Sequence, residues 1–193
     1  MAYQGQTIEN PFTGQSLHFL TTARQTGGAA LVLQSSWRGR GAEPPAHCHP
    51  AQEELFEVLQ GQLTVRLDGE LRRLRAGDQL RIGPGQVHSM WNEEAERATA
   101  RWVTRPALRT EELLETTFSL AQAGLVGASG APGLLQASVL LPAYDREFRL
   151  ARPPRWVQRL VFGLLRPVAR LIGLKATYST GPALPEAVAA AGA

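Results

Sequence analysis

Cysteine is almost absent from this chain of 193 residues, because Cys48 is the only one. A single thiol cannot form a disulfide within the chain, so we expect a hydrophobic core to stabilise the fold. Long apolar runs are also missing, and the one at 160–165 ends at Arg166. It is far shorter than the roughly 20 residues needed to span a bilayer. Residues 1–6 lack the basic and apolar regions of a signal peptide, so we predict a cytoplasmic protein.

Lysine is scarce as well, and the positive charge is concentrated in one part of the sequence. The net charge is +3, yet residues 1–144 carry 12 arginines against 14 acidic residues. Residues 145–175 carry seven arginines and Lys175 against two acidic residues, so the basic balance belongs to this segment. A basic segment can meet nucleic acid or anionic lipid, or it can be a solvated helix face. Without a helix-turn-helix pattern, a zinc-finger pattern or a broad lysine-rich surface, nucleic acid is not expected as a partner.

Up to about residue 105 the sequence is typical of an all-β domain. Short apolar or alternating runs are separated by turn residues at close spacing. Asp68-Gly69 lies between two such runs and predicts a tight hairpin, because a type I′ turn needs positive φ at both central positions. The predicted strands are 17–20, 29–36, 55–59, 63–67, 71–74, 79–82, 87–91 and 98–103. This pattern predicts a mainly β sandwich or barrel.

After Pro106 the pattern becomes helical. Thr110 precedes two glutamates and is predicted to be the N-cap of a helix that can end at Gly124. A second short helix is predicted over 134–141, after a glycine-rich loop. We therefore divide the chain into a β-barrel over residues 1–106, a helical extension over 107–176 and a disordered tail over 177–193.

The third helical segment, 155–174, is amphipathic. Its arginines share one narrow stripe at helical spacing beside a broad apolar face, and they are Arg155, Arg159, Arg166 and Arg170. Pro167 should kink or break the helix at its middle. The apolar face can pack on the barrel or on a second subunit, lie on a membrane surface, or cover the barrel mouth as a lid. Packing or dimerisation is the first expectation, and peripheral membrane contact is the second.

Three of the four histidines fall in two short motifs that suit a metal site. His47 and His49 are two residues apart, so on a strand they project from one face while Cys48 points away. Glu54 follows beyond a proline corner and can return beside them from the next strand. Two imidazoles and a carboxylate make a divalent site with open positions. His88, which follows a Gly-Pro-Gly turn, can add a fourth ligand from across the barrel.

The residues next to these ligands in the sequence indicate which glutamate binds the metal and which side chains line the substrate space. Glu53 competes with Glu54 for the carboxylate role, but the spacing to Gly61 and the alternation along the strand favour Glu54. Four residues share the faces of the ligands and are predicted to line a substrate space: Phe56, Val58, Met90 and Asn92. His18, the fourth histidine, is expected to be structural or exposed.

Both stretches resemble the two sequence motifs of the cupin family. The first motif matches at Gly41, His47, His49, Glu54 and Gly61. The second matches at Gly77, Gly85, His88 and Asn92, whereas Gly83 stands where the motif has proline. The resemblance implies a cupin jelly-roll barrel, also called a double-stranded β-helix, with its motifs over residues 41–92. It also implies one divalent metal ion held by the three histidines and Glu54. The whole chain further resembles a bacterial group of single-cupin proteins.

The family resemblance predicts the fold more strongly than the reaction. Cupins include dioxygenases, sugar isomerases and epimerases, decarboxylases, oxalate oxidases and non-enzymatic sensors, and one fold hosts all of them. The predicted apolar wall favours a metal-dependent oxygenase acting on a small apolar or aromatic molecule, with Glu54 as a candidate base. The first alternative is a non-catalytic small-molecule sensor or binding cupin, associated with a membrane through 155–174. A sugar isomerase or epimerase ranks last, because it would call for more polar inward residues.

The ligand set leaves the metal open. Iron, manganese, nickel, copper, cobalt and zinc all accept three imidazoles and a carboxylate. The expected partners are a small-molecule ligand and, by resemblance to cupins that pair edge strands or helical tails, a second copy of the chain in a homodimer.

Overall fold

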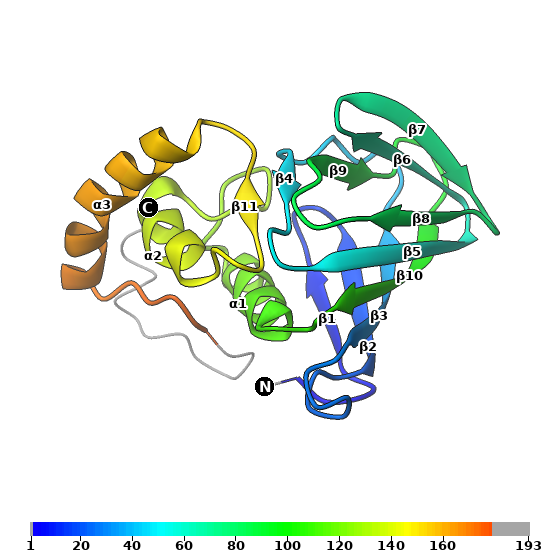
Figure 1. The fold of residues 1–193 in the computed structure, drawn as a ribbon, viewed down its shortest axis with the longest axis horizontal. Coiled ribbons are helices and arrows are strands. Elements are labelled where there is room, and N and C mark those ends of the chain that lie inside the picture. The colour runs from blue at the N-terminus through cyan, green and yellow to red at the C-terminus, as the bar shows by residue number, and fades with distance from the viewer. Residues whose placement is uncertain (1, 179–193) are drawn as a thin grey trace.

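The computed structural model describes residues 2–178, which form two antiparallel sheets and a group of three helices (Figure 1). The first sheet contains β1 (Thr7–Asn10), β2 (Gln15–Thr21), β3 (Leu31–Trp37), β5 (Glu53–Gln60), β8 (Gln79–Ile82) and β10 (Ala98–Arg105). The second contains β4 (His47–Cys48), β6 (Gln62–Leu67), β7 (Glu70–Arg75), β9 (His88–Trp91) and β11 (Arg149–Leu150). The helices are α1 (Thr110–Gln122), α2 (Leu134–Ala143) and α3 (Arg155–Leu171). The predicted mainly β jelly-roll barrel with a C-terminal helical extension is confirmed.

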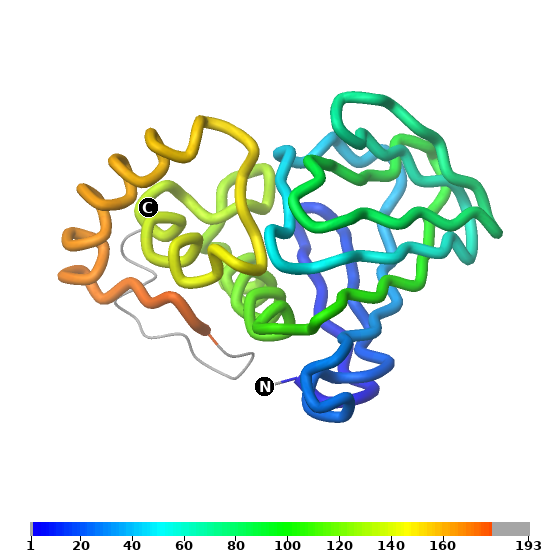
Figure 2. The backbone as a smooth tube through the Cα atoms, in the orientation of Figure 1, coloured from blue at the N-terminus to red at the C-terminus, as the bar shows by residue number. Residues whose placement is uncertain are grey.

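The order of the strands explains how the helices meet the barrel. The first sheet runs β1-β2-β3-β10-β5-β8, and the second runs β11-β4-β9-β6-β7. β11 comes from the extension and pairs with β4, so the extension continues the second sheet at its edge. The backbone trace shows the helices gathered on this side of the barrel, away from β7 (Figure 2).

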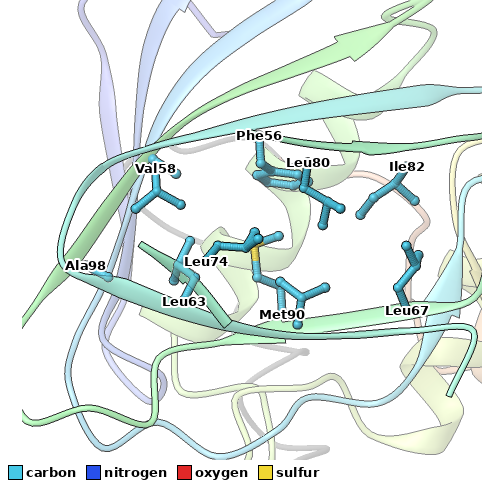
Figure 3. Packing of buried hydrophobic residues seen from close by; sticks show 11 residues of the cluster. Phe56, Val58, Leu63, Leu67, Leu74, Leu80, Ile82, Met90 and Ala98 are labelled. Atoms are coloured by element: carbon cyan, nitrogen blue, oxygen red, sulfur yellow. The ribbon is translucent and has the colours of Figure 1, made fainter. Parts of the chain in front are cut away.

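The core follows from alternation along the strands. On β5, Glu54, Phe56 and Val58 are buried while their neighbours point outward, which is the period of two that a half-buried strand requires. Apolar side chains of both sheets meet in the space between them (Figure 3). This cluster consists of Phe56, Val58, Leu63, Val65, Leu67, Leu74, Leu80, Ile82, Met90, Ala98 and Ala100.

A second core lies where α1 covers the first sheet. Leu33 on β3 is the cross-strand partner of Trp102 on β10, which in turn faces Phe56 on β5, so all three share one face of the sheet. Phe56 packs against side chains of the second sheet. Leu33 packs instead in a cluster with Phe19 of β2 and Phe118 of α1. Trp102 touches both clusters and therefore marks the junction between barrel and extension.

Two tight turns reverse the chain on either side of β6. Asp68 and Gly69 both have positive φ, 49° and 92°, between β6 and β7, so the predicted tight hairpin is confirmed. Gly61 joins β5 to β6 with φ of 76°, and a Cβ there would lie 2.7 Å from the Arg97 carbonyl oxygen. Glycine is needed at this position for both reasons.

The prediction that Thr110 caps the first helix is wrong. Thr110 is the first helical residue, Arg109 occupies the N-cap position, and no side chain caps the helix. The Thr110 hydroxyl instead donates to the amide oxygen of buried Gln52, at 3.1 Å. A tertiary hydrogen bond to the barrel has replaced the local cap that the sequence pattern favours.

Of the predicted kink or break at Pro167, the break is wrong, because α3 runs without interruption from Arg155 to Leu171 (Figure 1). Pro167 removes the hydrogen bond to the carbonyl of Gly163, and Gly163 is exposed, so water can bond to that carbonyl. Within residues 2–178, no helix combines the length and the apolar character that crossing a membrane requires. Of the predicted tail 177–193, residues 179–193 lie outside the described residues, while Tyr178 is buried and bonds to Thr116.

Candidate metal centre

Three imidazoles converge at one end of the barrel interior. His47 on β4 is the cross-strand partner of His88 on β9, and His49 follows β4 by one residue. Ligand nitrogens of the three rings all lie within 4.8 Å of one another. Glu54 reaches them from the opposite sheet, and its Oε2 lies 3.2 Å from Nε2 of both His49 and His88. The structure thus brings together the four side chains that the motifs predict as ligands.

Hydrogen bonds from the outer nitrogen of each ring set the tautomers. Each Nδ1 faces a backbone carbonyl oxygen: that of Pro45 for His47, Glu147 for His49 and Gln86 for His88, at 3.2, 2.6 and 3.1 Å. A carbonyl can only accept, so Nδ1 carries the hydrogen of the neutral imidazole. The lone pair of each Nε2 is then free, and partners of this kind orient the histidines of metal sites.

Glu54 leaves one oxygen for a cation. Its side chain is buried, and Oε1 accepts a hydrogen bond of 3.0 Å from the indole Nε1 of Trp102. Oε2 is buried without a hydrogen bond within the described chain, although two imidazoles lie close to it. In the tautomers above those imidazoles have no hydrogen to donate to it. A buried carboxylate oxygen facing unprotonated nitrogens fits a divalent cation, which satisfies all of them together.

The pKa of His47 agrees with this set of ligands. Burial, reinforced by the neighbouring His88 and His49, lowers the pKa of His47 to about 3, so this ring is neutral at neutral pH. A neutral imidazole is the form that binds a metal without first losing a proton.

The low pKa of His47 predicts that the metal-free protein loses stability in acid. An unfolded histidine takes up its proton near pH 6.5, whereas folded His47 does so only near pH 3, so the unfolded state binds more protons in between. The free energy of unfolding should fall as the pH drops through this window, by up to about 1.4 kcal/mol per pH unit. Urea titrations of chelator-treated protein at several pH values measure this slope.

His47→Gln should flatten that slope, and His18→Gln is the matched control because His18 lies on β2, outside the cluster. Equal slopes for the wild type and His47→Gln would contradict the prediction.

A cavity of about 230 Å³ adjoins the four groups, and its wall is mostly apolar. The barrel contributes Trp37, Phe56, Met90 and Trp102, and the extension contributes Leu113, Leu114 and Phe148. The Phe148 ring stacks on His47, with centroids 4.7 Å apart and planes 24° apart. The extension therefore forms part of the cavity wall through α1 and the segment before β11. No described residue of α3 lines this cavity.

Two of the four predicted wall residues line this cavity and two do not. Phe56 and Met90 do so, but Val58 lies two residues further along β5 and packs in the barrel core. Asn92 lies in the turn after β9, where its side-chain amide nitrogen donates hydrogen bonds to the carbonyls of Trp37 and Glu96. The corrected wall therefore contains Phe56 and Met90, but neither Val58 nor Asn92.

Three contributors to the site were not among the predicted site residues: Trp102, Phe148 and the Glu147 carbonyl. Trp102 lies on a predicted strand, and its pairing with β5 would have placed it beside the ligands. Phe148 and Glu147 precede a two-residue strand that shows no alternating pattern. Glu53 forms an ion pair with Arg81 on the outside of the barrel, which agrees with the choice of Glu54.

Trp102→Phe tests how much the indole hydrogen bond supports the site. The change keeps an aromatic ring but leaves Oε1 of buried Glu54 without its donor, so the carboxylate loses its orientation. We expect affinity for the metal to fall about 10–100-fold, as when such outer partners are removed elsewhere. Competition with a chromogenic chelator measures it. Trp37→Phe, which also changes the cavity wall but removes no bond to Glu54, should leave the affinity nearly unchanged.

The cupin domain family model matches residues 39–104, which hold all four of these side chains. The chain therefore contains a domain of the cupin superfamily. The match covers β4 to β10 and excludes the helical extension.

Curated relatives of this cupin are distant and longer. An oxidoreductase of Arthrobotrys oligospora is 28% identical over 159 residues, which are 78% of this chain and 60% of the relative. Quercetin 2,3-dioxygenase of Bacillus subtilis is 32% identical over 77 residues, 40% of this chain and 23% of the relative. The cupin thus spans less than two thirds of the length of either relative.

Solved structures match about half of this chain. A predicted oxalate decarboxylase from Thermotoga maritima matches with a TM-score of 0.48 and 18% identity, over 53% of this chain and 92% of that one. KdgF from Halomonas sp. matches with a TM-score of 0.42 and 22% identity, over 48% of this chain and 81% of that one.

Proposed function

We propose that this cupin is a metal-dependent enzyme of the oxygenase type that acts on a small apolar or aromatic molecule. The observation that carries the proposal is the buried Glu54 Oε2, which accepts no hydrogen bond from any described residue and faces the histidines beside an apolar cavity. The names of the two relatives, an oxidoreductase and a dioxygenase, are consistent with this class of reaction.

His47, His49, His88 and Glu54 would hold the metal ion. A divalent metal held by four ligands keeps one or two positions for substrate and O₂ or water, and supplies Lewis-acid or redox activation there. The ordinary ligand preferences of iron, manganese, nickel, copper, cobalt and zinc all agree with this set.

The protein's own residues bind and orient the substrate. Phe56 and Trp102 are stacked with centroids 5.5 Å apart, and the ring of Phe148 lies over His47, so flat surfaces border the cavity. Such surfaces suit an aromatic ring, which aromatic side chains bind by stacking and area burial. If Oε2 of Glu54 leaves the metal, it can accept a proton from a substrate hydroxyl, while the Trp102 indole still holds the carboxylate through Oε1. The apolar wall keeps water away from this proton transfer.

A non-catalytic binding or sensor cupin is the second candidate. Glu54 and Glu147 are the only carboxylates among the described lining residues, and Glu147 Oε1 already accepts the backbone N–H of Arg109. A site with one free proton acceptor can bind a ligand without transforming it. A sugar phosphate isomerase is disfavoured, because no arginine or lysine is among the described residues that line the cavity.

The test begins with protein purified without a chelator or a metal-affinity tag. Elemental analysis identifies the ion, and each candidate metal is then loaded into the stripped protein. Oxygen uptake is recorded against a panel of small aromatic and apolar compounds. Glu54→Gln should abolish the uptake, and Glu53→Gln, the adjacent outward carboxylate, should preserve it.

Each outcome decides between the candidates. Uptake that requires both the metal and Glu54 supports the oxygenase. Metal and ligand binding without uptake favours the sensor. A wild type that binds none of the ions overturns both.

A further inference from the structure

The outer face of α3 carries a row of exposed apolar side chains, which we call the outer ridge. Its members recur about every four residues along the helix: Trp156, Leu160, Leu164, Val168 and Leu171. Each is at least 50% exposed, and Leu171 is 86% exposed. The opposite face is buried through Gln158, Phe162 and Ala169, so the ridge is not the surface by which α3 packs on the rest of the chain. A contiguous exposed apolar surface of this kind marks an interaction site.

Positive charge lies along one edge of the ridge. α3 holds four arginines and no acidic residue. Arg155 pairs with Asp145, whereas Arg159 and Arg170 form no ion pair with any described residue. Nε of Arg166 is buried and has no hydrogen-bond partner within the described chain. Arginine edges beside an apolar face are typical of helices that lie in the interface of an anionic membrane.

A cavity of about 250 Å³ opens beside this edge, between α2, β11 and α3. Arg149, Arg155, Arg159 and Arg166 line it, and Asp145 is the only carboxylate among its described lining residues. Asp145 accepts hydrogen bonds from Arg149 and Arg155, at 2.9 and 2.7 Å. No described residue forms an ion pair with Arg159 or Arg166. Several guanidinium groups around one cavity suit a phosphate group, because phosphate oxygens accept bidentate hydrogen bonds from arginine.

We propose that this cupin docks on an anionic phospholipid surface through α3, with the outer ridge among the acyl chains and a headgroup phosphate in the arginine-lined cavity. The ridge and the cavity are neighbours, since Gly163 and Arg166 of the same helix line the cavity. An anionic bilayer supplies both the negative charge and the apolar layer that these two features need. A second copy of the chain would bring the same positive edge against this one, so charge complementarity disfavours it as the occupant.

Vesicle binding by the full chain tests the proposal. One set of vesicles is phosphatidylcholine alone, and the other contains about one third phosphatidylglycerol, which gives an anionic surface. We expect at least about tenfold stronger binding to the anionic vesicles, weakened by added salt.

Two variants address the two features separately. Arg159→Gln/Arg166→Gln removes the unpaired charges of the cavity, and Leu160→Gln/Leu164→Gln removes part of the exposed ridge. Each should lower binding to anionic vesicles by about tenfold or more. Arg72→Gln/Arg73→Gln on β7 is the control, because it removes the same charge from an exposed strand on the far side of the barrel. Near-wild-type metal content in all three variants shows that the barrel is folded.

Several results would overturn membrane docking. These are equal binding to both vesicles, loss of binding in the β7 control as large as in the cavity variant, or binding of inorganic phosphate without any vesicle binding. A lipid-free dimer in sedimentation that Leu160→Gln/Leu164→Gln dissociates would assign the ridge to a second copy instead. None of these readouts depends on the enzymatic reaction.

Discussion

Replacing His47 and His88 together with alanine should abolish near-stoichiometric metal binding. The two rings are direct cross-strand partners with centroids 4.4 Å apart, so the change removes one whole side of the cluster. His49 and Glu54 remain, and two ligands do not make the three- or four-ligand site that holds a transition metal tightly. Elemental analysis of the wild type and the variant, purified side by side, measures the difference.

Thermal stability gives a second measure of the lost metal binding. A metal ion that binds only the folded state at a thousand times its Kd adds about 4 kcal/mol of stability. The wild type should therefore melt at a markedly higher temperature when the ion is added, and the double variant should show no shift. His18→Ala is the matched control, because it removes a histidine outside the cluster and should keep both the ion and the shift. A double variant that still holds the ion would exclude this metal centre.

Replacing Gln52 with alanine should destabilise the protein by about 2–4 kcal/mol, since buried hydrogen-bonding groups lose their partner. The buried Gln52 amide nitrogen donates to the carbonyls of Pro106 and Ala107, at 2.7 and 3.0 Å. Its oxygen accepts from the Thr110 hydroxyl, so one side chain ties the barrel to the start of α1. Urea unfolding of both proteins at neutral pH gives the difference in free energy.

Gln60→Ala is the comparison for this change, because Gln60 is exposed at the end of β5. It should alter the free energy of unfolding by less than about 0.5 kcal/mol. Since α1 supplies Thr110, Leu113 and Leu114 to the cavity wall, Gln52→Ala should also weaken ligand binding in the metal cavity. A stability close to that of the wild type would show that water replaces the lost hydrogen bonds.

The ligands could be predicted because their geometry is local. His47 lies on β4 and His49 follows it directly after Cys48, so the two-residue step predicted that both rings face one side; the alternation from Glu54 to Phe56 continues on β5. The positive φ required at Asp68-Gly69 is equally local, and so the hairpin was predictable. Most strands of the barrel have strong alternation or turn residues on both sides, and the predicted runs lie within one or two residues of the observed bounds.

The remaining features depend on contacts between distant segments. β1 is four residues long with exposed alternate positions, and β11 is two residues long, so neither contains enough of a pattern to be recognised. The role of Trp102 depends on the pairing of β10 with β5, and that of Phe148 on the pairing of β11 with β4. The bond from Thr110 to Gln52 overrode a local capping preference for the same reason.

The Glu147 carbonyl belongs to the helical extension and contacts Nδ1 of His49, which belongs to the barrel. The two parts of the chain therefore contribute differently to the site. The barrel supplies every proposed ligand, whereas the extension supplies one of the groups that orients them and much of the wall. Changes in the extension can therefore alter the shape of the accepted molecule while the ligands stay the same. Replacing the backbone around residue 147 is different, because it would also change the electron donation of one imidazole to its metal. For a designer, α1 is the part to vary for selectivity, and the turn that ends in Phe148 is the part to vary for reactivity.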